Sequence, residues 1–136
     1  MNYIQQIELD FCTISLREDG IIENRFLRDV PYEITESQLI QISDAISKLS
    51  SGRKDAILSV AGLYGSMTPE ARKISINTDN EYTLAIALVI QDLSQRLLAN
   101  FYFRIKKVNY PVKIFKSEEE ATSWLYQQIH TSQQTG

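Results

Sequence analysis

Glycines and hydroxyl side chains come together in residues 62–68, where the sequence offers its best candidates for chemistry. Gly62 and Gly65 precede Ser66, and Thr68 follows two residues later. The segment joins the carboxyl end of a predicted strand to a predicted helix, a place where unpaired amides and the helix dipole attract anions. It is neither a phosphate loop nor a nucleophile elbow. Ser66 and Thr68 are therefore candidate binding residues, and capping of the helix is the alternative role for Thr68.

Two arginines and an asparagine could complete such a site. Arg72 lies one turn into the helix that follows Thr68, and Arg96 and Asn100 are four residues apart on a later helix. A guanidinium binds carboxylate or phosphate groups through two parallel hydrogen bonds. We expect Arg96 and Asn100 at the margin of a buried apolar stripe. Arginines in such positions also serve as ordinary surface or capping groups, and that alternative stays open.

The residues that most enzymes require are scarce in this sequence. His130 is the only histidine and lies near the end of the last helix, and Cys12 is predicted to be a buried, inert thiol inside a strand. One histidine and one cysteine can form neither a zinc site nor a catalytic triad. The carboxylates at 118–120 occupy the first turn of a helix, where capping and the helix dipole account for them. The sequence therefore predicts no enzyme, no metal and no cofactor.

Composition indicates a globular protein. The 136 residues are 43% hydrophobic and 23% charged, and the length suits one domain, with 1–7 and 131–136 expected to be frayed. The single cysteine allows no internal disulfide. No apolar run is long enough to predict a membrane span, and the first residues lack the pattern of a signal peptide. We expect a cytoplasmic protein that does not insert into membranes.

Charge is distributed unevenly along the chain. Residues 1–50 carry nine acids and four bases, and residues 51–136 carry eight acids and ten bases, which gives the overall charge of −3. Nucleic-acid-binding domains are usually strongly basic. The closest approach to a basic patch consists of Arg104, Lys106, Lys107, Lys113 and Lys116. We interpret these as a solvated face and predict no nucleic-acid partner.

Hydrophobic periodicity predicts an α/β domain with the element order β-β-α-β-α-β-α-β-α. Gly20 marks the turn of an opening hairpin, Thr35 and Gln38 form a capping box, and Pro69 begins the second helix. The predicted strands are 8–17, 21–28, 55–61, 83–90 and 111–115, and the clearest helices are 36–49, 92–105 and one that begins at Ser117. Alternating strands and helices indicate a mostly parallel sheet with an antiparallel N-terminal hairpin.

Two predicted helices carry apolar stripes that should face the core. The helix at 92–105 presents Leu93, Leu97, Leu98, Phe101 and Ile105. The last helix presents Ala121, Trp124, Leu125 and Ile129. We expect Trp124 to be largely buried, with its indole N–H bound to a carbonyl or water. The competing interpretation is that this ring is exposed for a partner.

The order of elements and three segments resemble the STAS family, whose fold is called SpoIIAA-like. The segments are residues 68–72, 96–101 and 111–125, and the likeness is closest to small stand-alone bacterial STAS/SEC14-type proteins. It implies a single SpoIIAA-like domain that acts as a non-enzymatic regulatory or protein-interaction module. In regulatory members an Asp-x-Ser element at the second helix carries a phosphorylated serine. The resemblance implies that Ser66 or Thr68 is the corresponding phosphoacceptor here, and residues 64–68 depart from the pattern by lacking that aspartate.

Two functions follow as hypotheses. The first is a module that binds a protein partner near the start of the second helix, through Ser66 or Thr68. The alternative is a module that binds a small anion or lipid near Arg72 and Arg96. A homodimer is a further hypothesis, because two-fold dimers are the commonest protein assembly.

Overall fold

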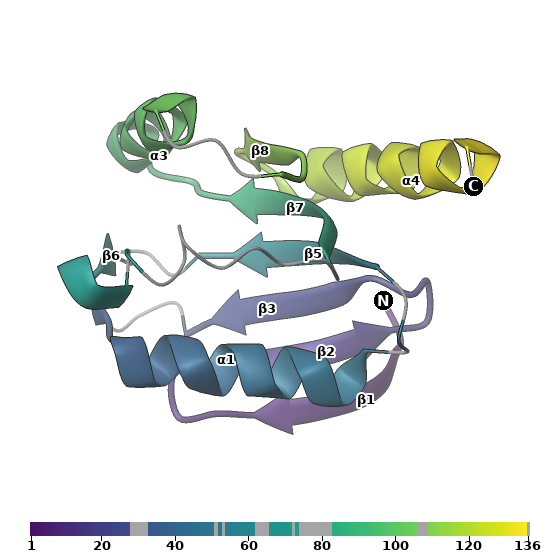
Figure 1. Cartoon of the computed structure of the whole chain (residues 1–136), viewed down its shortest axis with the longest axis horizontal. Coiled ribbons are helices and arrows are strands. Elements are labelled where there is room, and N and C mark those ends of the chain that lie inside the picture. Colours follow the sequence, from purple (N-terminus) through teal and green to yellow (C-terminus); the bar gives the residue numbers. More distant parts are fainter. Residues whose placement is uncertain are drawn as a thin grey trace.

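Six strands form one mixed sheet in a computed structural model that describes residues 1–27, 33–50, 52, 54–61, 66–71, 73, 83–105 and 109–135. The strand order is β1-β2-β3-β5-β7-β8 (Figure 1). Neighbours among the first three strands are antiparallel, and the remaining pairs are parallel. The strands are β1 (Tyr3–Glu8), β2 (Cys12–Arg17), β3 (Ile22–Phe26), β5 (Asp55–Val60), β7 (Thr83–Val89) and β8 (Val112–Phe115). The predicted α/β class and N-terminal hairpin are confirmed.

The first strand lies in residues for which the sequence predicted fraying and no element. β1 pairs with β2 over Tyr3–Glu8, although its side chains are mostly exposed. An exposed edge strand has little apolar alternation, so its sequence pattern is weak. The β2–β3 turn is as predicted, with Gly20 at a φ of 87°. At the other end the last helix continues to Thr135, over residues for which the sequence predicted fraying.

Helix α1 (Glu36–Leu49) crosses one face of the sheet in front of β2 (Figure 1). Its predicted capping box is present: the Gln38 amide donates to Thr35 Oγ1, and the Thr35 amide donates to Gln38 Oε1. The helix buries Ile42, Ala45 and Leu49. These pack on a cluster that includes Phe11, Cys12, Ile14, Ile22 and Phe26.

Helix α4 (Glu118–Thr135) packs on the opposite face, mainly over β5 and β7. Its buried residues are Ala121 and Leu125, and the sheet beneath presents Ala85 and Ala87. These alanines have small side chains, so the helix lies close to the strands. The helix begins as predicted, because the Glu120 amide donates to Ser117 Oγ at 3.2 Å.

Helix α3 (Leu93–Ile105) confirms the predicted boundaries but not the predicted orientation. Leu93, Leu97, Leu98 and Phe101 are 59–69% exposed instead of buried. The half-buried positions include Gln95, Arg96, Ala99 and Phe103. α3 therefore turns its more polar side toward the protein and its apolar stripe outward.

Candidate functional site

Ser66 and Thr68 lie beside the segment that leads into α1. Short strand β6 (Ser66–Met67) pairs in parallel with β4 (Glu33–Ile34), and the Thr68 amide donates to the Ile34 carbonyl at 2.9 Å. The Thr68 hydroxyl oxygen accepts from the Ala71 amide at 3.1 Å. The capping alternative therefore describes what Thr68 does here. For Ser66 the structure fixes only the backbone position, opposite Glu33.

Arg96 holds the connection between β7 and α3. Its Nη1 donates to the carbonyls of Ile90 at 3.0 Å and Gln91 at 2.7 Å. Asp92 caps the same helix by accepting from the Gln95 amide at 2.9 Å. These bonds satisfy backbone groups at the carboxyl end of β7, and they occupy one of the guanidinium nitrogens that an anion would need.

The remaining predicted site residues are Asn100 and Arg72. Asn100 is exposed on α3, and Arg72 lies outside the described residues. The hydrogen bonds of Thr68 stay with its own helix start and β4, and those of Arg96 stay with the β7–α3 connection. The described hydrogen bonds of Thr68 and of Arg96 are therefore each local to their own segment.

The apolar face of α3, defined as Leu93, Leu97, Leu98 and Phe101, is the most exposed hydrophobic surface on any described helix. Steps of three and four residues place these side chains on neighbouring turns. Monomeric proteins scatter single apolar residues over their surfaces, whereas a contiguous patch marks an interaction site. The sequence contained this stripe, but its period alone could not tell burial in the chain's own core from burial in a partner.

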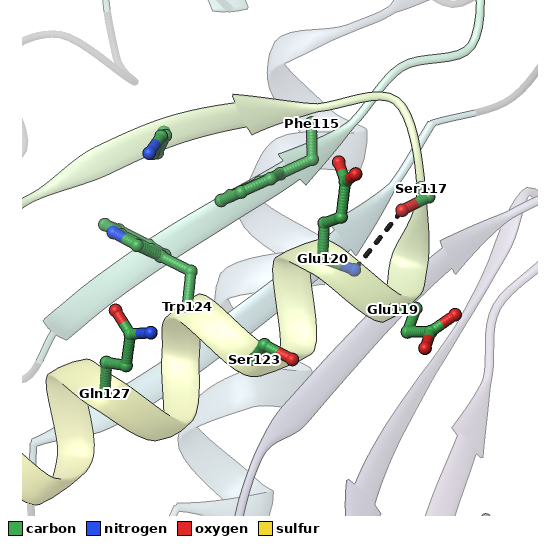
Figure 2. A pocket seen from close by; sticks show the side chains of 8 residues that line it. Phe115, Ser117, Glu119, Glu120, Ser123, Trp124 and Gln127 are labelled. Carbon is green, nitrogen blue, oxygen red and sulfur yellow. Dashed lines mark hydrogen bonds between the residues drawn. The ribbon is translucent and has the colours of Figure 1, made fainter.

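A groove of about 520 Å³ runs between β8 and the outer side of α4 (Figure 2). The rings of Phe115 and Trp124 lie 5.8 Å apart at 51°, and Lys113 Nζ lies 5.5 Å from the Phe115 ring centroid. Trp124 is half-buried, beside the fully buried Leu125. The prediction of a largely buried ring is therefore only half correct, since one side of the indole lines the groove.

A network of charged side chains, which the sequence analysis missed, joins the β2–β3 hairpin to α4. Arg17 binds both oxygens of Asp19, at 3.2 and 2.6 Å, and approaches Glu23 at 3.7 Å. Arg25 donates to Glu23 at 3.3 Å and forms a two-point ion pair with Glu118 on α4. Glu118 is therefore more than a first-turn carboxylate, because it anchors the start of α4 to β3.

Two tyrosines close this network. Tyr126 donates to Asp19 Oδ2 at 2.6 Å, and Tyr3 donates to Glu23 Oε2 at 3.0 Å. The side chains of Arg17 and Glu23 are each only 5% exposed. The network is internally paired, and its hydrogen bonds dock β1 and α4 onto the β2–β3 hairpin.

The Asp19 carboxyl makes this docking sensitive to acid. Burial alone would raise its pKa, but hydrogen bonds from Tyr126, Arg17 and the Ile21 amide outweigh burial, and the pKa is lowered. The folded state then binds fewer protons than the unfolded chain, so this stabilisation is present above the unfolded pKa of about 3.9 and disappears as the pH falls through the folded pKa.

We expect Asp19→Asn to be less stable than wild type at pH 7, with a smaller difference at pH 3. Urea unfolding of both proteins between pH 3 and pH 7 measures the difference in stability. A difference that stays constant with pH would contradict the prediction.

Other reactive groups in the described residues carry no site. Burial raises the pKa of the Cys12 thiol to about 12, which agrees with the prediction of an inert cysteine. Asn24 Oδ1 is buried without a hydrogen-bond partner in the described part of the chain. Histidine, cysteine and carboxylate groups do not gather in threes that could hold a metal, as far as the structure describes the chain. The same residues contain no helix long and apolar enough to cross a membrane.

Comparison with solved structures supports the fold. The crystal structure of an uncharacterised DUF3478-family protein with a SpoIIAA-like fold, from Shewanella loihica PV-4, has a TM-score of 0.59. The identity is 15% over 92% of this chain and 98% of that one, so the likeness concerns the fold. A protein of unknown function from Arthrobacter sp. FB24 is 24% identical over 82% of this chain and 90% of its own, with a TM-score of 0.29.

Sequence comparison names the family. No curated protein matches this chain significantly. The family model described as a domain of unknown function, DUF7793, matches residues 14–129. The STAS resemblance thus predicted the fold correctly, while the matching family model is a different one. The chain has a SpoIIAA-like fold and belongs to the DUF7793 family.

Proposed function

We propose that this protein is a non-enzymatic interaction module of STAS type that binds a protein partner through the apolar face of α3. The observation that carries the proposal is the exposure of four large apolar side chains, 59–69%, on neighbouring turns of one helix. Covering such side chains is favourable by about 25 cal/mol per Å² of apolar area. A helix that presents this stripe fits an apolar groove on a partner, in the manner of helix-in-groove recognition.

The charges within α3 itself favour a protein over a membrane surface, although Lys106 and Lys107 follow the helix in the sequence. Helices that lie on membranes usually carry several Lys or Arg side chains on the polar face, and these attract anionic lipids. α3 has two arginines, of which Arg96 contacts its own backbone, and the whole chain has a net charge of −3. The small-anion alternative also loses support, because Arg96 already donates hydrogen bonds to two backbone carbonyls.

Site-specific photo-crosslinking in the source cell tests the proposal. A photoreactive amino acid at Leu97 should yield a cross-linked adduct with a different protein, whereas the same group at Ser43, an exposed position on α1, should not. Leu98→Glu should abolish the adduct, because a charge would have to enter an apolar interface.

Three results would contradict the proposal. These are equal cross-linking at both positions, no adduct at Leu97, and an α3-dependent association with anionic vesicles in place of a protein.

An additional arm examines the helix start: Ser66→Asp and Thr68→Asp mimic phosphorylation, which adds about −1.5 to −2 charge. A changed adduct yield would link residues 66–68 to partner binding, and an unchanged yield would remove the switch from the proposal.

A further inference from the structure

The groove beside α4 carries opposite charges at its two ends. Lys113 lines the groove from the first half of β8, two residues before Phe115. Glu119 and Glu120 lie at the start of α4, where the chain turns back (Figure 2). Among the described residues, none of these three side chains forms an ion pair within the chain. Half-exposed Phe115 and Trp124 lie between the charges. The groove thus has a positive end, an aromatic centre and a negative end.

The groove borders an edge strand whose outer side has no strand partner among the described residues. β8 ends the order of the sheet, with β7 as its neighbour. The Ile86 amide donates to the Pro111 carbonyl at 3.0 Å, and the Ile90 amide donates to the Phe115 carbonyl at 2.9 Å. Backbone groups alternate along a strand, so the amide and carbonyl of Val112 and Ile114 point away from β7.

We infer that a second copy of this chain binds at this edge, with the two β8 strands antiparallel about a two-fold axis at Ile114. Residues with outward backbone groups then face each other, so Ile114 pairs with its own copy. On the α4 side of the sheet, Lys113 of each chain lies opposite Phe115 of the other. An axis at Lys113 would also align the backbone groups, but it would place the two lysines face to face, which is unfavourable.

The charge pattern favours a second copy over an unrelated peptide. A two-fold axis exchanges the ends of the groove, so Lys113 of each chain approaches Glu120 of the other. An edge lysine normally discourages strand pairing, and here the opposite charge of the second copy compensates it. The axis also brings together the two Phe115–Trp124 pairs, and partly exposed tryptophans of this kind are enriched at interfaces.

Charge reversal provides the test. Wild-type protein should form a dimer in sedimentation velocity, and Lys113→Glu and Glu120→Lys should each weaken dimerisation by more than about tenfold, because each places like charges at both symmetric contacts. An equimolar mixture of the two variants should dimerise again. In the mixed dimer the two substituted side chains face each other with opposite charges, and the unchanged Lys113 of one chain faces the unchanged Glu120 of the other. This rescue requires a self-complementary interface.

Trp124 gives an independent readout because it is the only tryptophan. Dissociation of the wild-type dimer by dilution should shift its emission to the red. Glu8→Lys on the other sheet edge is the matched control and should leave dimerisation unchanged. So should Leu98→Glu, which keeps this inference separate from partner binding through α3. A monomeric wild type, two unaffected charge variants, or a mixture that stays monomeric would each overturn the inference.

Discussion

Replacing Arg17 with methionine should lower the free energy of unfolding by about 3–5 kcal/mol, the usual cost of removing one partner from a buried ion pair. Arg17 is 4% exposed and is the cation that lies against both Asp19 and Glu23. Methionine retains much of the side-chain volume, so the loss reports mainly on charge. Glu23 is 4% exposed in the wild type, and without the guanidinium it keeps only Arg25 as a cationic partner among the described residues. Urea unfolding at pH 7 measures the change.

The matched control lies at the other end of the same network. Glu118→Gln removes the partner of Arg25, but these two side chains are 41% and 38% exposed, so water screens the pair and the expected cost is about 1 kcal/mol or less. Adding Glu23→Leu to Arg17→Met should recover part of the loss, because it removes the poorly compensated carboxylate. The interpretation fails if Arg17→Met costs no more than Glu118→Gln.

The elements whose sequence patterns match their surroundings could be predicted well. Thr35 and Gln38 predicted the start of α1, and the unbroken apolar run before residue 90 predicted an interior parallel strand. β1 could not be predicted, because an exposed edge strand is held by backbone pairing and has little hydrophobic period. Local sequence patterns therefore predicted those elements that bury apolar side chains of their own, and missed the strand that is held by its backbone alone.

The candidate sites were harder to predict than the fold. Glu23 and Arg25 alternate on β3 with the apolar Ile22 and Phe26, which indicates a second, polar face of the strand. Their pairing with Arg17 and Glu118 depends on strand register and on the position of α4, which no local pattern contains. In the same way, the stripe on α3 predicts a buried surface but not whether the chain itself or a partner covers it.

Leucine-to-alanine substitutions on two helices test this distinction directly. Leu125 is 0% exposed on α4, where its neighbours on the sheet and helix include Ala85, Ala87 and Ala121. Since these small side chains cannot move into the space left behind, Leu125→Ala should lower the free energy of unfolding by about 2–5 kcal/mol. That is a large share of the roughly 5–15 kcal/mol that holds a typical domain together.

The same substitution on α3 should have almost no effect on the isolated chain. Leu98 is 69% exposed, so Leu98→Ala removes few internal contacts and should change the free energy of unfolding by about 0.5 kcal/mol or less. Urea unfolding of both variants under one condition compares the same leucine-to-alanine change at an exposed and at a buried position. If Leu98→Ala were as costly as Leu125→Ala, the apolar face of α3 would belong to the chain's own core. A large cost at Leu125 alone leaves that face free for the partner.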